Sequence, residues 1–293
     1  MFQHTSIGLH PALYRFCIQR DLALRSDIAI AWRKLRVEIV PLEPSYEHIF
    51  WEHVNQDIPH YFFFAFDWKY NRDNTKILLA LEGNRIDGMM LAYRQSIVQF
   101  RGSGEAVKAL LERLDLEKVE LQALEEHEQC VLEKYKTTAA HKLMLMMLHR
   151  GEERLQINHP ISKLDVSDAE QIAAIMEEAD PEFWRTTTSQ QIVEGMSRGA
   201  SWFGIRVDGE PASISGSRLT EWGGHISTVA TRAAHRNKGY ATSVVSYAVK
   251  QILEKHSVAM IYVLRDNPPA IRVYSKVGFK PYRTYFFMRG ERR

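Results

Sequence analysis

Two spacings of apolar residues alternate along the chain. Short, nearly continuous apolar runs predict buried strands at 75–81, 85–93, 118–123, 141–148, 155–158, 201–207, 211–219, 226–231 and 260–264. Apolar residues spaced three or four apart predict helices at 46–54, 105–114, 129–135, 169–179, 189–196 and 241–249, and a last helix beginning near Pro268 or Pro269. Because strands and helices mix along the chain, we expect an α/β fold with mixed central sheets.

The first residues follow a different pattern. From 8 to 39, apolar side chains recur at helical spacing until Pro41 and Pro44 interrupt it. We therefore expect an N-terminal helical arm over 1–44, with no chemistry of its own. A polar stretch at 151–154 separates two further units, 45–152 and 153–293.

Composition narrows the function classes. The 293 residues are 45% hydrophobic and 25% charged, which fits folded domains, and the net charge of +2 does not favour nucleic acid or an anionic membrane as a partner. No apolar run is long enough for a transmembrane helix, and the start lacks the pattern of a signal peptide. The only two cysteines, Cys17 and Cys130, lie far apart, which indicates a reducing compartment; we expect a cytoplasmic protein.

The segment from Arg236 to Ala241 joins a predicted strand to a predicted helix. Such a loop presents unpaired backbone N–H groups and the positive end of a helix dipole to one point, which suits a phosphate or pyrophosphate. Gly239 and Ala241 leave room for the phosphate, and Arg236 and Lys238 add positive charge. Taken alone, this loop could also be an ordinary turn.

A second block follows the apolar run at 260–264. Asn267 precedes a helix whose first turn holds two prolines, and Gly278 ends that helix. Ala270 and Tyr274 lie four residues apart and share one face of the helix.

The two blocks read R-x-x-G-x-A and, about thirty residues later, N-x-x-A-x-x-x-Y-x-K-x-G-F. In this order and spacing they resemble the GNAT superfamily of acyl-CoA-dependent N-acetyltransferases. The resemblance covers residues 153–293, about half of the chain. It implies that acetyl-CoA, or another acyl-CoA, binds there as a co-substrate. The residues it assigns to the coenzyme are Val229, Ala230, Thr231, Arg236, Asn237, Lys238, Gly239, Tyr240, Ala241, Thr242, Asn267, Ala270, Tyr274 and Lys276.

Tyr274 is the first catalytic candidate. A phenol near the thioester can protonate the leaving thiolate, since the pKa values of tyrosine and thiol, about 10 and about 8.5, lie close enough for proton transfer. The alternative is a buried tyrosine whose hydroxyl only finds a partner. For Val229–Thr231 the resemblance implies contacts with the pantetheine arm, and the alternative is ordinary sheet pairing.

The general base is open among Glu221, His225, Asp266 and Glu194, with His225 preferred because it enters the strand near the active centre. The resemblance places 180–185 over the thioester, where Phe183 and Trp184 would select the acceptor; both could equally be core residues. We expect no metal site: His48 and His53 lie on different faces of a helix, and the acidic cluster at 125–128 is typical of a solvated surface.

The order of predicted elements repeats. Gln99 to Gly104 fits the pattern Q-x-x-G-x-G, and Gly102 and Tyr135 precede Gly239 and Tyr274 by nearly the same number of residues. We expect two tandem GNAT-like folds, similar to the glycine N-acyltransferase type. The first copy is degenerate because Glu128 stands in the place of Asn267 and Val131 in that of Ala270.

These observations predict an acyl-CoA-dependent N-acyltransferase. Its second unit would transfer an acyl group to a primary amine of a small molecule or peptide by direct attack. The alternative is a non-catalytic module that binds or senses acyl-CoA, which the missing carboxylate base keeps open. Transfer from charged tRNA is disfavoured by the charge balance. A homodimer is compatible with the sequence.

Overall fold

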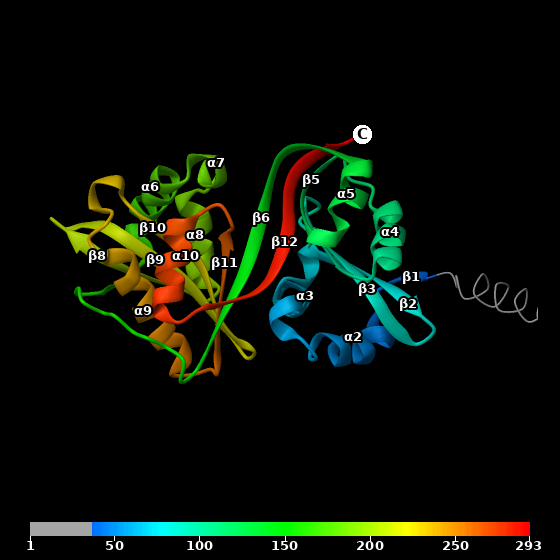
Figure 1. The fold of residues 1–293 in the computed structure, drawn as a ribbon, viewed down its shortest axis with the longest axis horizontal. Helices are drawn as coiled ribbons and strands as arrows, with labels where there is room; N and C mark the ends of the chain where they lie inside the picture. Colours follow the sequence, from blue (N-terminus) through cyan, green and yellow to red (C-terminus); the bar gives the residue numbers. More distant parts are fainter. Residues whose placement is uncertain (1–36) are drawn as a thin grey trace, which may run out of the picture.

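The computed structural model describes residues 37–293, which form one twelve-stranded mixed sheet with helices on its faces (Figure 1). The strands are β1 (Glu38–Pro41), β2 (Thr75–Glu82), β3 (Arg85–Tyr93), β4 (Ile97–Gly102), β5 (Lys118–Leu124), β6 (Tyr135–His149), β7 (Ser162–Leu164), β8 (Ala200–Val207), β9 (Glu210–Thr220), β10 (Gly223–Thr231), β11 (Val258–Leu264) and β12 (Lys280–Arg292). The α-helices are α2 (Glu47–Val54), α3 (Ile58–Tyr70), α4 (Gly104–Arg113), α5 (Glu128–Lys134), α6 (Ala169–Ala179), α7 (Pro181–Trp184), α8 (Ser189–Ser197), α9 (Tyr240–Leu253) and α10 (Pro268–Val277). The α/β fold class is therefore confirmed.

The same order of elements occurs twice. Residues 38–149 run strand, two helices, three strands, helix, strand, helix, strand. Residues 162–292 repeat this order, with the short α7 as the single addition. We call these segments the first half and the second half.

The last strands of the two halves are interleaved. The sheet order is β1-β2-β3-β4-β5-β12-β6-β11-β10-β9-β8-β7. Strand β12 therefore lies between β5 and β6 of the first half, and β6 lies between β11 and β12. Figure 1 shows these two long strands side by side at the middle of the molecule, and antiparallel pairing joins them along most of their length. Each half completes the sheet of the other.

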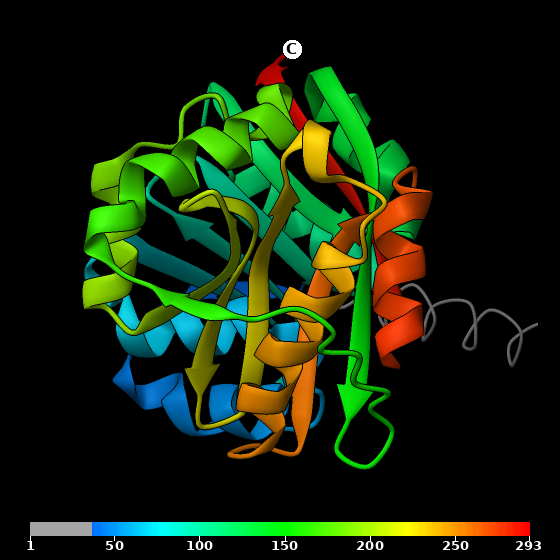
Figure 2. The ribbon, with the colours of Figure 1, turned by 90° about the vertical axis from the view of Figure 1, so that its left-hand side faces the viewer.

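Helices cover both faces of the sheet. In the second half, α9 and α10 pack on one face around Val249, Ile252 and Val277, and Figure 2 shows α9 crossing in front of the strands. Helices α6 and α8 cover the opposite face through Ile172 and Ile192.

Helix α3 joins the two halves on that opposite face. Its Phe62 packs with Met260 of β11 and Tyr285 of β12, although the helix itself belongs to the first half. Residues from both halves therefore share this hydrophobic cluster.

Two sequence expectations need correction. The helical arm at 1–44 lies outside the described residues up to 36, and from 38 to 41 the chain is strand β1 paired with β2 instead of a helix. The strand expected at 155–158 is wrong. There the backbone N–H groups of Gln156 and Asn158 bond to Ser246 Oγ and Ser243 Oγ of α9, so side chains of a helix take the place of a partner strand.

Helix α3 was missed. Its sequence Ile58–Tyr70 is apolar or aromatic on nearly every face, because it is buried between the halves, so no helical period is visible. Its start was readable: Asp57 Oδ1 accepts a hydrogen bond from the His60 N–H at 3.2 Å, and Pro59 follows in the first turn.

Candidate functional site

Strand β10 separates from β11 partway along its length. The two strands pair in parallel only over Gly224–Ile226 and Ala259–Ile261, although β10 continues to Thr231 and β11 to Leu264. On its other side β10 stays paired with β9 as far as Thr231, apart from an irregularity between Ile226 and Thr228. The backbone of 228–231 therefore has one paired edge and one edge released from β11.

The helix after this strand begins without a side-chain cap. Gly239 is its N-cap residue, with φ at +81°, and Asn237 before it is also left-handed, with φ at +63°. Among residues 37–293, no side chain bonds to the first-turn N–H groups of α9. A 14-residue helix thus opens with free N–H donors and the positive end of its dipole, which together suit an anion.

Helix α10 faces this loop from the other side. Asn267 Oδ1 caps it by accepting a hydrogen bond from the Ala270 N–H at 3.1 Å. Pro268 and Pro269 occupy its first turn, and Gly278, with φ at +120°, ends it. The cap fixes where the helix starts and therefore where Tyr274, one turn after Ala270, meets the cavity wall.

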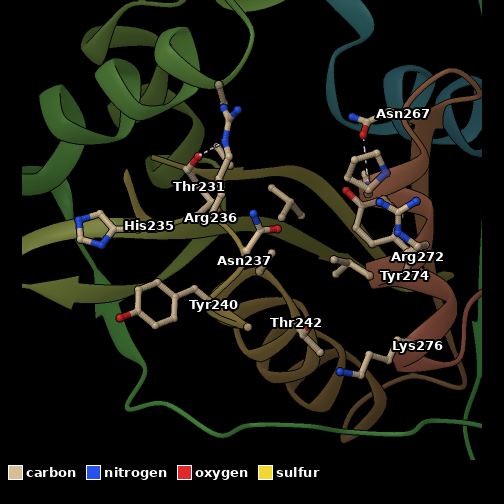
Figure 3. A pocket seen from close by; sticks show the side chains of 18 of the residues that line it. Thr231, His235, Arg236, Asn237, Tyr240, Thr242, Asn267, Arg272, Tyr274 and Lys276 are labelled. Atoms are coloured by element: carbon tan, nitrogen blue, oxygen red, sulfur yellow. Dashed lines mark hydrogen bonds between the residues drawn. The ribbon is translucent and has the colours of Figure 1, made fainter. Parts of the chain in front are cut away.

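The released strand edge, the uncapped helix and Tyr274 line one cavity of about 800 Å³ (Figure 3). Arg236, Arg272 and Lys276 contribute positive charge to its wall, and Asp180 is the single acidic residue that the described part of the chain adds to it. Figure 3 shows Arg272, Tyr274 and Lys276 on α10 facing the loop that carries Asn237. The balance of charge favours an anionic ligand.

Most residues that the sequence analysis assigned to the coenzyme line this cavity. They are Val229, Ala230, Thr231, Arg236, Asn237, Gly239, Tyr240, Ala241, Thr242, Asn267, Ala270, Tyr274 and Lys276. Lys238 is outside this set; its carbonyl oxygen lies 3.1 Å from His159 Nε2. His235 and Arg272 also line the cavity and were not predicted from the sequence. Arg272 had a signal, since it lies four residues before Lys276 on the same helix face.

Tyr274 is 6% exposed, and burial raises the pKa of its hydroxyl well above the usual tyrosine range. The phenol therefore stays protonated at neutral pH and beyond. It can donate a hydrogen bond or a proton to an atom in the cavity.

His225 lies on the other face of β10. Its neighbour Ile226 packs towards α9, whereas the His225 ring packs against Phe62 and Phe63 of α3 and Tyr262 of β11. Burial, with a smaller contribution from Arg218, lowers the pKa of His225 to about 4, so the imidazole is neutral at pH 7. His225 does not line the cavity of Tyr274.

The other candidate bases are dispersed. Glu221 bonds to Lys69 and Tyr70 at the turn between β9 and β10. Glu194 lies on α8 and Asp266 in the turn before α10, and neither lines the cavity. In the segment 180–185, which was expected to select the acceptor, Trp184 lines the cavity, while Phe183 packs against Phe287 of β12.

In the first half, the position equivalent to the free first turn of α9 is occupied by side chains of the protein itself. Strand β4 also leaves β5 after Gln99, but the helix that follows is capped: Ser103 Oγ accepts from the Ala106 N–H at 3.2 Å and donates to Asp87 Oδ2 at 2.5 Å. Gly102 approaches β3 so closely that a Cβ there would lie 2.3 Å from the Cα of Gly88. A carboxylate, Asp87, thus stands where the second half leaves its donors free.

Arg101, at the same place, was not anticipated. It is 1% exposed, and its guanidinium donates to the His60 and Phe100 carbonyl oxygens and to the side-chain oxygens of Gln99 and Gln122. Gln122, a polar residue inside the strand predicted at 118–123, was the available signal for this network, whereas Gln99 and Arg101 lie in β4, for which no strand bounds were predicted.

The comparisons with known proteins agree with this geometry. A family described as "FR47-like protein" matches residues 202–288, which run from β8 into β12 and include the whole loop and α10. No protein with a curated description matches the chain.

Solved structures match over a larger part. A Drosophila protein is 12% identical, covers 85% of this chain and 98% of its own, and has a TM-score of 0.65. A protein from Novosphingobium aromaticivorans, described as an acetyltransferase of the GNAT family, is 18% identical over 73% of this chain and 91% of its own, with a TM-score of 0.52. A tandem GNAT protein from the clavulanic acid biosynthesis pathway is 13% identical over 74% and 82%, with a TM-score of 0.50.

At these identities the likeness is one of fold, and the fold is that of the GNAT acetyltransferases. The resemblance to the glycine N-acyltransferase type and the domain boundaries stay predictions. Within residues 37–293, no helix is long and apolar enough to cross a membrane.

Proposed function

We propose that the second half binds acetyl-CoA, or another acyl-CoA, and transfers its acyl group to a primary amine. One observation carries the proposal: the released edge of β10, the uncapped first turn of α9 and the protonated Tyr274 line the same cavity. The three features correspond to the three parts of an acyl-CoA that need recognition, namely its amide-containing arm, its pyrophosphate and its sulfur.

The pyrophosphate would lie at the N-terminus of α9. The free N–H groups of the first turn would donate to its oxygens, and Arg236 and Lys238 would add charge at the rim. The pantetheine amides would pair with the backbone of 228–231 in the place that β11 leaves. This arrangement leads the thioester between β10 and β11, towards Tyr274.

The reaction would be a direct attack. The amine nitrogen forms a bond to the thioester carbon, the C–S bond breaks, and the electron pair leaves on sulfur. Tyr274 would donate to the thiolate, and the attacking amine would lose its proton to a base. His225 remains our candidate for that base; because its ring does not line this cavity, it would have to act through a water. Its low pKa makes it a weak one, so we expect it to matter less than Tyr274.

We also propose that the two halves are tandem copies of one fold and that the first half does not bind CoA. The capped α4, the Asp87 carboxylate and the buried Arg101 support this, because they occupy the positions that a pyrophosphate and a pantetheine arm would need. Glu128 pairs with Lys142 at the start of α5, where the second half has Asn267.

Calorimetry with acetyl-CoA and an assay of thiol release over a panel of amines test the proposal. We expect one molecule of acetyl-CoA per chain and thiol release that depends on an amine. Binding without release for any amine would favour the alternative, a module that senses acyl-CoA. Two equivalent acetyl-CoA sites per chain would contradict the proposal that the first half does not bind CoA.

A further inference from the structure

A second cavity, of about 760 Å³, lies between the two halves. We call it the inter-half cleft. Helix α3 and the end of β3 form its wall on the side of the first half, and α8 and β9 form the wall on the side of the second half. Four aromatic rings line it, those of Phe63, Phe66, Tyr70 and Tyr93.

Three arginines point to the chemistry of its ligand. Arg94, Arg198 and Arg218 line the cleft, and within residues 37–293 neither Arg94 nor Arg218 forms an ion pair. The Arg218 guanidinium donates to the carbonyl oxygens of Arg198 and Gly195, and it lies 5.4 Å from the ring centre of Phe66. Arg94 lies over the ring of Tyr93.

The acidic residues of the cleft are largely engaged. Glu194 lies 3.8 Å from Arg198, and Asp67 accepts a hydrogen bond from Asn71. Gln99, also in the wall, accepts from the buried Arg101, which places a further positive charge behind it. The cleft therefore favours an anionic group, with aromatic surface beside it.

The cleft lies next to the place where the proposed reaction occurs. Segment 180–198 borders both cavities, since Asp180 and Trp184 line the first and Glu194 and Arg198 the second. On β9, Arg218 pairs with His225 of β10, and His225 precedes Val229 on the same strand. At about 3.3 Å per residue, the backbone of His225, which lies beside Arg218, is about 13 Å from the backbone of Val229 at the released edge.

We infer that the inter-half cleft binds the acceptor, and that this acceptor is an elongated anionic amine: a short peptide with a free N-terminus and an acidic end. The inference rests on the proposed function. A free α-amino acid cannot place its amine at the thioester and its carboxylate at Arg218, because the separation corresponds to about four extended residues. The first half would thus supply part of the acceptor site through α3 and Arg94.

Two tetrapeptides, offered as acceptors to the full-length protein, test this inference. They are Gly-Ala-Ala-Glu with a free C-terminus and Gly-Ala-Ala-Gln-amide. Both present the same amine, and only the first is anionic at its far end. Binding is measured by calorimetry to the chain saturated with CoA, and turnover by thiol release from acetyl-CoA. We expect the anionic peptide to bind at least about tenfold more tightly, and free glycine to be a poor acceptor.

Variants then locate the anion. Arg218→Gln and Arg94→Gln should each lower the preference for the anionic peptide, whereas Arg218→Lys should keep part of it because the charge remains. Arg113→Gln, an exposed residue of α4 that lines neither cavity, is the matched control and should change nothing. Acetyl-CoA affinity should be unchanged in all four.

The failures are distinguishable. If the wild type binds acetyl-CoA but does not discriminate between the peptides, or if both glutamine variants retain the full preference, the inference is wrong and the proposed function stands. If the wild type does not bind acetyl-CoA, the proposed function itself fails.

Discussion

Tyr274 is the residue on which the proposed chemistry depends most directly. We expect Tyr274→Phe to lower turnover by about 10²–10⁴-fold, the usual contribution of a general acid or base, with acetyl-CoA affinity nearly unchanged. Since burial raises the pKa of Tyr274, activity should also show no loss from its deprotonation up to about pH 10. Steady-state kinetics over pH and calorimetry measure both.

Tyr135 provides the matched control for that variant. The sequence repeat makes Tyr135 the equivalent of Tyr274 in the first half. Tyr135 is fully buried, and its hydroxyl donates to the Leu116 carbonyl oxygen at 3.0 Å, away from the cavity. Tyr135→Phe should cost about 1 kcal/mol of stability and leave turnover alone. Full activity in Tyr274→Phe would mean that water protonates the thiolate and that Tyr274 is structural.

A substitution at Gly239 tests whether acetyl-CoA binds at the start of α9, as proposed. A Cβ there would meet only His159 Nε2, at 3.6 Å, but the φ of +81° is strained for any other residue, and a glutamate would bring negative charge to the first turn of α9. We expect Gly239→Glu to abolish acetyl-CoA binding in calorimetry. Gly209→Glu is the control, because Gly209 has φ at +87° in an open turn and does not line the cavity. Equal loss in both would point to misfolding.

At the scale of the element, His60 of α3 should make the stability of the folded protein depend on pH. His60 on α3 is 6% exposed, and its Nδ1 lies 2.9 Å from the Tyr285 hydroxyl of β12. Burial, followed by the charge of Arg101, lowers the pKa of His60 to about 2 from 6.5. The unfolded chain therefore binds one proton more than the folded chain below pH 6.5. Stability is full above that pH and falls as the pH drops.

We expect His60→Gln to flatten that fall. One proton corresponds to about 1.4 kcal/mol per pH unit, so the variant should lose about 2 kcal/mol less than the wild type between pH 7.5 and pH 5. Asp67 acts in the opposite sense, since burial raises its pKa to about 6 and the folded chain then holds the extra proton; this term is common to both proteins and cancels. Urea unfolding at the two pH values measures the difference, with the exposed His48→Gln as control. Identical slopes would contradict a neutral His60.

Elements with a clear period and a clear end were predictable, and buried aromatic ones were not. The strand at Arg85–Tyr93 and the helix at Ala169–Ala179 have the predicted bounds, because turn residues flank them and one face is apolar. Helix α3 shows no helical period of apolar residues, because it is buried on most sides and carries apolar residues on nearly every face. The loop and α10 could be found because glycine, asparagine and proline stand where local backbone geometry requires them. The site across the sheet, with His225 and the arginines, depends on how the halves pack, and no local pattern records that.

At the scale of the whole molecule, the interleaving of β6 and β12 determines what can fold alone. In the segment 153–293, β11 would lose its partner β6, and β12 would lose both β5 and β6. Three strand edges that are paired in the full chain, one of β11 and both of β12, would then be exposed, together with the apolar side chains that α3 covers, which favours aggregation.

We therefore expect the isolated segment 153–293 to be poorly soluble, although it contains every residue of the proposed coenzyme cavity. Adding back β6 by starting the chain at residue 135 would restore the partner of β11 but leave β12 without β5, so recovery should be partial. Size-exclusion chromatography and hydrogen exchange of β11 and β12 in the three chains measure this. A monomeric 153–293 segment with the acetyl-CoA affinity and acceptor selectivity of the full chain would show that the halves are independent, and would remove the physical reason for keeping a first half that does not bind CoA.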